Sequence, residues 1–204
     1  MGIKVLSLFD GMSCTQLALQ QCGIEVDTYY ASEIDKYAIQ VTQKNFPNTI
    51  QIGDVCNVDP KNYKDIDLIT CGSPCQGFSF AGKQLAFDDP RSALFFEFIR
   101  ILKEIKPKYF LLENVRMKQQ FQDVITDQVS ACYPDFQGED LFEGKIKPIL
   151  INSALVSAQN RLRLYWTNIP NVEQPKDQGI VLKDILVKEE EWQEEVPQYL
   201  QNHF

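Results

Sequence analysis

A cysteine and a glutamate that follow two apolar segments are the residues best suited to chemistry. Cys75 lies within residues 72–80, directly after the apolar run 66–71, which predicts a buried strand. Glu113 follows a second apolar run at residues 109–112. Open α/β sheets bind ligands at the carboxyl ends of their strands, so we expect both side chains at one sheet edge. A thiol and a carboxylate placed there suit attack on an electron-poor ring carbon while a ring nitrogen is protonated.

Each of these residues also has a purely structural explanation. Cys75 can be a structural thiol beside a turn, although the proline before it and the glycine after it favour an exposed, rigid loop. Glu113 can be a carboxylate that begins a helix. Arg161 and Arg163 alternate with apolar residues before the last predicted strand, where they can bracket a phosphate or carboxylate or lie on the surface.

Three acidic residues follow the first three predicted strands. Asp10 precedes Gly11 in the first turn, and a glycine there lets a ligand approach the backbone closely. Glu33 and Asp54 end the second and third strands. Nucleotide-binding α/β proteins use an acid at the end of the second strand to bind ribose hydroxyls. Each acid alone is most simply a helix cap, but three at successive strand ends predict an adenosine-binding site.

The elements that must position these residues alternate along the chain. Strands are predicted at residues 4–9, 26–31, 49–52, 66–71, 109–112, 148–152 and 164–167. Helices are predicted at residues 14–22, 35–46, 92–105 and 117–132, with a polar loop at 133–147 and a short helical piece at 181–186. This alternation predicts an α/β fold with a mostly parallel sheet and helices on both faces.

Composition and charge narrow the class of protein. The 204 residues are 44% hydrophobic and 24% charged, as in one globular domain. There is no signal sequence and no apolar run of membrane length, so we expect a soluble cytoplasmic protein with no membrane partner. Six scattered cysteines and one histidine form no zinc pattern, so no metal is expected. The net charge of −8, part of it in the acidic stretch 189–195, has the wrong sign for a self-sufficient nucleic-acid-binding protein.

Several short motifs occur in a fixed order along the chain. They are Leu8-Phe9-Asp10-Gly11, Glu33, Gly53-Asp54-Val55, the loop 72–79 around Cys75, Asp89-Pro90-Arg91 with Leu94-Phe95-Phe96, Glu113-Asn114-Val115, and Gln159-x-Arg161-x-Arg163. In this order they resemble the catalytic half of the cytosine 5-position DNA methyltransferases over residues 4–168. The segment 7–11 is most similar to the animal de novo class and to phage enzymes.

The resemblance implies a class-I S-adenosylmethionine-dependent methyltransferase fold, which is Rossmann-like with a mostly parallel seven-stranded sheet. It implies S-adenosyl-L-methionine as cofactor, double-stranded DNA as partner, and methylation of a flipped cytosine through a covalent adduct with Cys75. The implied catalytic residues are Cys75, Glu113, Arg161 and Arg163. The implied cofactor-binding residues are Phe9, Asp10, Gly11, Ser13, Glu33, Ile34, Asp54, Val55, Ser73, Pro74 and Leu94.

The chain departs from the family pattern at two places. Ser13 and Cys14 stand where the first motif normally has its second glycine, which implies a reshaped site for the methionine end of the cofactor. After the arginine motif the family continues with a recognition domain and a closing motif. Here we expect a catalytic domain at residues 1–170 followed only by an acidic tail at 171–204.

Three arrangements are consistent with that second departure. The chain can be one part of a split enzyme, whose second polypeptide supplies recognition and the closing motif. It can be a catalytic half that is inactive alone. It can also be a catalytically silent module that binds cofactor or a partner and regulates. RNA in place of DNA is a further alternative substrate.

Overall fold

The computed structural model describes residues 2–74, 93–136 and 144–186. The strands are β1 Ile3–Leu8, β2 Val26–Ser32, β3 Ile50–Gln51, β4 Leu68–Cys71, β5 Tyr109–Val115, β6 Ile149–Asn152 and β7 Leu162–Thr167. The α-helices are α1 Cys14–Gln21, α2 Lys36–Asn45, α3 Ala93–Ile105, α4 Gln119–Cys132 and α5 Leu182–Ile185. Short 3₁₀ turns are η1 Val55–Asn57, η2 Pro60–Tyr63 and η4 Ser153–Leu155.

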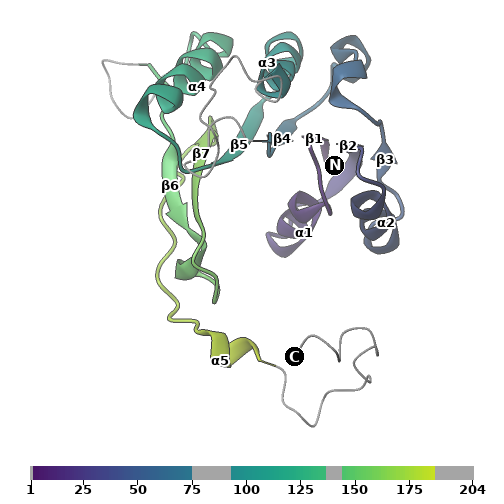
Figure 1. The fold of residues 1–204 in the computed structure, drawn as a ribbon. Coiled ribbons are helices and arrows are strands. Elements are labelled where there is room, and N and C mark those ends of the chain that lie inside the picture. The colour runs from purple at the N-terminus through teal and green to yellow at the C-terminus, as the bar shows by residue number, and fades with distance from the viewer. Residues whose placement is uncertain (1, 75–92, 137–143, 187–204) are drawn as a thin grey trace. The chain divides into compact units, whose positions relative to one another are not determined.

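The strands of the described residues form one seven-stranded sheet in the order β3-β2-β1-β4-β5-β7-β6. The pairs β1–β2, β1–β4, β2–β3 and β4–β5 are parallel, and β7 runs antiparallel to β5. Helices α1 and α2 lie on one face of the sheet, and α3 and α4 lie on the other (Figure 1). The predicted Rossmann-like fold, with a mostly parallel seven-stranded sheet covered on both faces, is therefore confirmed.

Large apolar side chains fill the space between the sheet and the helices α3 and α4. The largest fully buried ones are Trp166, Phe95, Phe98, Phe110, Leu6, Leu8, Ile69, Ile101, Leu102, Leu112 and Ile125. A second and smaller cluster of buried residues consists of Val5, Leu19, Tyr29, Ala31 and Leu68. Burial of this much apolar surface is the main force that fixes the central strands and hence the sheet edge.

Strand β5 is longer than predicted, and the difference changes the setting of Glu113. The sequence predicts a strand that ends before Glu113, whereas β5 continues through Val115. Pairing with β4 ends at Leu112, but the antiparallel strand β7 continues to pair, with Glu113 opposite Tyr165. Glu113 therefore lies in a paired strand and not in a turn, because β7 supplies backbone partners that β4 no longer offers.

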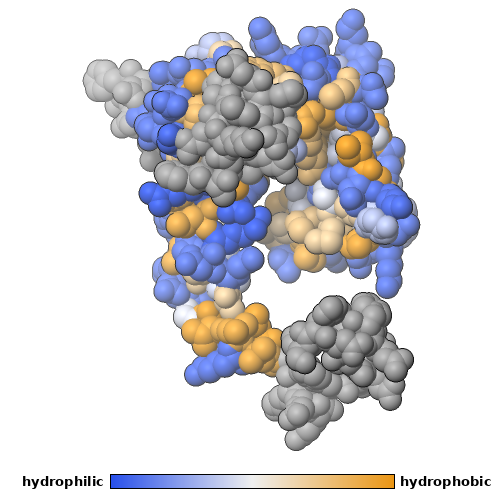
Figure 2. Space-filling model, in the orientation of Figure 1, coloured by the Kyte–Doolittle hydropathy of each residue, from blue (hydrophilic) through white to orange (hydrophobic). Residues whose placement is uncertain are grey.

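The chain divides into two compact units, Met1–Ile151 with Leu162–Glu173, and Asn152–Arg161 with Gln174–Phe204. In the second unit the Gln178 amide donates to the Leu155 carbonyl at 2.8 Å. Figure 2 shows hydrophobic side chains gathered over α5, where Leu182, Ile185 and Leu186 are exposed.

The predicted acidic tail beyond residue 186 lies outside the described residues. None of the described helices is long and apolar enough to span a membrane.

Candidate cofactor and active site

The centre of the sheet contains the point at which the strand order reverses. β1 and β4 are neighbours, and the chain builds outward from them in opposite directions, to β2 and β3 on one side and to β5 on the other. Such a switch point opens a crevice at the carboxyl ends of the two strands. Residues 9–13, which follow β1, and residues 72–74, which follow β4, come directly after these ends. A hydrogen bond of 3.3 Å between the Thr15 and Thr70 hydroxyls ties α1 to β4 below them.

The turn after β1 has a backbone that changes hand repeatedly. Phe9, Gly11 and Ser13 have positive φ angles of 56°, 61° and 59°. Glycine adopts this region freely because it lacks a Cβ, so the Gly11 position suits the residue that occupies it. The Gly11 amide donates to Glu33 Oε2 at 2.8 Å, and its carbonyl accepts from the Thr42 hydroxyl at 3.3 Å. The end of β2 and helix α2 therefore hold this turn from two directions.

Glu33 is anchored by the backbone around it. Its Oε1 accepts from the amides of Ile34 and Asp35 at 2.8 and 2.9 Å, while Oε2 accepts from Gly11. The neighbouring Ile34 side chain is 73% exposed. A fixed carboxylate that can accept from sugar hydroxyls, next to an open apolar side chain that can cover a ring, fits a nucleoside. The residues present thus fit the adenosine part of S-adenosyl-L-methionine.

Asp54 also lies on a firmly held turn. Its Oδ1 accepts from the Cys56 amide at 2.9 Å and begins η1, whose Val55 is buried. Arg100 of α3 donates to the carbonyls of Val55 and Val58, at 3.4 and 3.0 Å. The Ser32 hydroxyl at the end of β2 donates to the Gly53 carbonyl at 2.8 Å. The structure therefore connects the ends of the second and third strands, as an adenosine site across them requires.

Glu113 and Arg163 meet across the β5–β7 pair. Arg163 Nε lies 2.7 Å from Glu113 Oε1, and the two side chains are 17% and 34% exposed. Arg163 Nη1 also donates to the Leu162 carbonyl at 2.8 Å, which fixes the guanidinium plane. A Cβ placed on Gly72 would lie 3.7 Å from Glu113 Oε2. The carboxylate thus lies against Gly72, three residues before Cys75 in the sequence.

A buried polar contact joins the same two segments below the carboxylate. Asn114 Nδ2 donates to the Ser73 hydroxyl at 3.3 Å, and Asn114 Oδ1 accepts from the Val115 amide at 2.8 Å. Both Asn114 and Ser73 are buried. Asn114 was not among the predicted site residues, although a polar side chain directly beside Glu113, on the opposite face of the strand, was a signal that it had a buried partner.

The remaining predicted residues are less closely assembled. Arg161 belongs to the second compact unit, where its amide donates to Asn152 Oδ1 at 2.9 Å and its carbonyl accepts from the Ser153 amide at 3.0 Å. Leu94, in the first turn of α3, packs against the main core. Cys75 and the motif at residues 89–91 lie outside the described residues. The structure therefore brings Glu113 and Arg163 together, and the other catalytic assignments stay predictions.

Cys71 ends β4 and is unsuited to nucleophilic chemistry. Its side chain is buried, and burial above all, with the negative charge of Glu113, raises the pKa of its thiol well beyond the usual range. In the ranges that the structure describes, no group of three or more His, Cys, Asp or Glu side chains is arranged to hold a metal ion.

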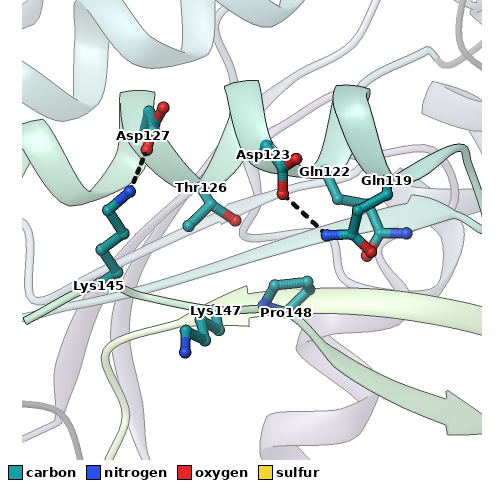
Figure 3. A pocket seen from close by; sticks show the side chains of 8 residues that line it. All are labelled: Gln119, Gln122, Asp123, Thr126, Asp127, Lys145, Lys147 and Pro148. Carbon is teal, nitrogen blue, oxygen red and sulfur yellow. Dashed lines mark hydrogen bonds and ion pairs between the residues drawn. The ribbon is translucent and has the colours of Figure 1, made fainter. Parts of the chain in front are cut away.

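A cavity of about 420 Å³ lies elsewhere, along α4 (Figure 3). It is lined by Gln119, Gln122, Asp123, Thr126, Asp127, Lys145, Lys147 and Pro148. Lys145 pairs with Asp127 at 2.9 Å, and Gln119 donates to Asp123 at 2.8 Å. None of the predicted site residues lines this cavity.

The sheet order, with an antiparallel strand between β5 and β6, defines the class as a Rossmann-like methyltransferase domain. Within that class, the family model described as C-5 cytosine-specific DNA methylase matches residues 3–203. The chain belongs to this family, as its motifs predict.

Individual relatives are similar over most of the chain. The orphan methyltransferase M.SPRI of Bacillus phage SPR is 35% identical over 193 residues, which cover 93% of this chain and 40% of that protein. The type II methyltransferase M.NlaX of Neisseria lactamica is 34% identical, and the match covers 90% of this chain and 59% of the relative. A solved putative DNA modification methyltransferase encoded within an E. coli prophage has a TM-score of 0.62 and 26% identity, covering 81% and 46% of the two chains. This chain thus spans only part of the length of its relatives.

Proposed function

We propose that this chain is the catalytic part of an enzyme that methylates carbon 5 of cytosine in double-stranded DNA. The observation that carries the proposal is the Glu113–Arg163 ion pair beside Gly72, at the start of the Cys75 loop. A carboxylate held by an arginine, beside the segment that leads to Cys75, is suited to bind a pyrimidine ring while a thiol adds to it. Membership of the C-5 cytosine-specific DNA methylase family supports the same reaction.

The cofactor of the proposed reaction is S-adenosyl-L-methionine, which supplies an electrophilic methyl group on a sulfonium sulfur. Glu33 accepts from the ribose hydroxyls, and Ile34 and Asp54 with Val55 contact the adenine. The turn 9–13 receives the remainder of the cofactor. Further cofactor contacts are assigned to Ser73, Pro74 and Leu94. The support for this assignment is the hydrogen-bonded connection between Glu33 and Gly11, which unites the ends of β1 and β2.

The chemistry begins with a cytosine that leaves the duplex and enters the crevice. The Cys75 thiolate forms a bond to carbon 6, and the π electrons of the 5,6 double bond move toward carbon 5 and the ring. Carbon 5 would then take the methyl group from the sulfonium sulfur, which keeps the electron pair of the broken S–CH3 bond and leaves as a thioether. Loss of the carbon 5 proton to solvent and departure of the Cys75 thiolate restore the double bond, so that the enzyme is regenerated.

Glu113 and Arg163 act on the ring during these steps. As charge develops on the ring, nitrogen 3 takes a proton from solvent and the Glu113 carboxylate accepts a hydrogen bond from the resulting N–H, an acid–base contribution of a kind typically worth about two to four orders of magnitude in rate. Arg163 fixes the carboxylate through the ion pair and orients the base. Arg161 is assigned to the thiolate and base region by the family motif alone.

The partners of the proposed enzyme follow from its charge. A net charge of −8 provides little non-specific attraction to DNA, because Lys and Arg must neutralise phosphates. We therefore infer that a second polypeptide supplies target recognition to the catalytic domain 1–170, with residues 171–204 beyond it. A cytoplasmic location, where thiols stay reduced, fits a cysteine nucleophile.

Covalent trapping tests the function directly. A duplex that contains 5-fluorocytosine should form a stable adduct at Cys75 in the presence of cofactor, because fluorine at carbon 5 prevents the proton loss that releases the thiol. The reaction is run with this protein alone and again with the product of the neighbouring reading frame added. Mass spectrometry of the digested protein then locates the adduct. Cys75→Ser is the control and should form none.

Other outcomes separate the alternatives. Binding of cofactor without an adduct under any of these conditions would favour the silent regulatory module. An adduct with a fluorinated tRNA, but none with the duplex, would make RNA the substrate. The absence of both cofactor binding and adduct would remove the proposed function altogether.

A further inference from the structure

Ser13 has an unusual conformation for a residue that precedes a helix. It occupies the N-cap position of α1, yet its backbone is left-handed, with φ 59° and ψ 41°. A serine at this position normally has an extended backbone, and its hydroxyl accepts from an amide of the first turn. Here the side chain makes no such bond. The buried Ser13 hydroxyl therefore serves a purpose other than helix capping.

The Ser13 hydroxyl belongs to a chain of hydrogen bonds that begins in β2. It donates to Asp10 Oδ2, and Asp10 Oδ1 accepts from the Tyr29 hydroxyl at 2.7 Å. Tyr29 is only 3% exposed, so water does not readily replace its bond to Asp10. Both carboxylate oxygens of Asp10 are thus engaged within the protein.

We propose that Tyr29, Asp10 and Ser13 form a positioning clamp that holds the turn 9–13 in the shape that receives the cofactor. The inference rests on the proposed function, because it concerns the affinity for S-adenosyl-L-methionine. Glycine holds a left-handed backbone without help, whereas the Cβ of serine makes it sterically unfavourable. The bond to Asp10 offsets that cost. Asp10, predicted above to bind cofactor, acts through the turn as a positioning residue.

The clamp affects the cofactor site because Gly11 lies between its two turn residues. The Gly11 amide donates to Glu33 Oε2 at 2.8 Å, so a turn that loosens also frees one oxygen of the carboxylate assigned to the ribose. On the far side of Ser13, Gln16 donates from Nε2 to the Ser13 hydroxyl at 3.3 Å and to the Thr49 hydroxyl at 2.7 Å. Loss of one bond of the clamp should therefore loosen the whole turn, and the affinity for the cofactor should fall as a result.

A double-mutant cycle measured by calorimetric titration with S-adenosyl-L-methionine tests the clamp. Tyr29→Phe removes the first hydroxyl and should weaken binding roughly tenfold, the scale for one buried hydrogen bond. In a Ser13→Gly background the same change should weaken binding by less than about threefold, because glycine needs no clamp. Tyr30→Phe, the same change one residue along β2, is the matched control and should bind as the parent protein does.

A second measurement separates the clamp from the proposed function. In the unliganded protein, amide hydrogen exchange at Gly11 and Ser13 should quicken roughly tenfold in Tyr29→Phe and much less with Ser13→Gly added. If the parent protein bound no cofactor while exchange followed this pattern, the proposed function would fail and the clamp would stand as a device of the turn alone. Unchanged exchange, or an equal loss of affinity in both backgrounds, overturns the clamp. If Tyr29→Phe does not fold, Asp10→Asn removes one acceptor and should give the same dependence on Ser13.

Discussion

The thiol of Cys71 and its neighbourhood illustrate how surroundings control a single residue. Cys71 is a free cysteine on β4, which pairs with a strand on each side, and it is 4% exposed. Cys14, Cys22 and Cys56 are exposed. Burial raises the pKa of the Cys71 thiol, so both access and ionisation oppose its reaction. Cys71 is therefore unsuited to be the nucleophile of the proposed reaction.

Alkylation of the native protein checks this difference. Iodoacetamide at about pH 8 should modify Cys14 and Cys22 while leaving Cys71 unmodified, because only a thiolate that meets the reagent reacts. Peptide mass spectrometry follows each site over time. The same treatment in strong denaturant is the control and should label all of them. Modification of Cys71 at the rate of Cys14 would show that β4 is not buried as described.

At the scale of elements, the pairing of β5 with β7 brings Glu113 and Arg163 together, and helix α4 packs against these strands. Trp166 of β7 is fully buried, and its indole N–H donates to the Thr126 hydroxyl of α4 at 3.0 Å. A buried donor without a partner costs free energy, so this bond fixes the position of β7 relative to α4. Strand β7, which carries Arg163, is thus held in place by Thr126, a residue of α4 that is not among the predicted site residues.

Thr126→Val should lower the free energy of unfolding by about 1–3 kcal/mol, because it keeps the shape of the side chain but leaves the Trp166 donor unpaired. Urea unfolding followed by tryptophan fluorescence gives the value. Thr28→Val on β2, a half-buried threonine with no such buried donor, is the matched control. A loss below about 0.5 kcal/mol, no larger than an ordinary surface substitution, would contradict the role given to this bond.

On the scale of the whole molecule, the buried Tyr29 and the half-buried Tyr133 make stability sensitive to alkaline pH. Burial, the largest cause in each case, raises the pKa of both Tyr29 and Tyr133 above the ordinary range. The unfolded chain has tyrosine pKa values of about 10. The folded state therefore holds these protons more tightly, and the resulting stability is complete below about pH 10 and is lost as the pH rises toward the folded values.

We expect the free energy of unfolding to fall between about pH 9 and pH 11, and to fall less steeply in Tyr133→Phe than in the parent protein. The variant also loses the hydrogen bond of 3.1 Å to the Pro107 carbonyl, so its stability is lower throughout and only the slope is compared. Urea unfolding at several pH values measures the slope of the unfolding free energy against pH. Tyr37→Phe, at an exposed tyrosine, is the matched control. Identical slopes in Tyr133→Phe and the parent protein would refute the expectation.

Much of the fold and part of the site were open to prediction because local patterns carry them. The alternation of apolar runs with helical periodicity predicted the sheet, and the ordered motifs predicted the family. The predicted end of β5 was wrong, because the last residues of this strand pair with a strand about fifty residues further along the chain. The engagement of Asp10 by Tyr29 was also missed, since a tyrosine in an apolar strand gives no sign of its partner.

The sequence by itself determined which residue types end each strand, and with them the α/β class and the family, and it predicted the kind of chemistry. Periodicity and short motifs are local properties, and a single chain displays them without folding. Only the tertiary structure decided that Glu113 pairs with Arg163, that Asn114 donates to Ser73, and that Tyr29 donates to Asp10. Those contacts join residues on different strands and turns, and their geometry exists only once the packed core has fixed the strands in register.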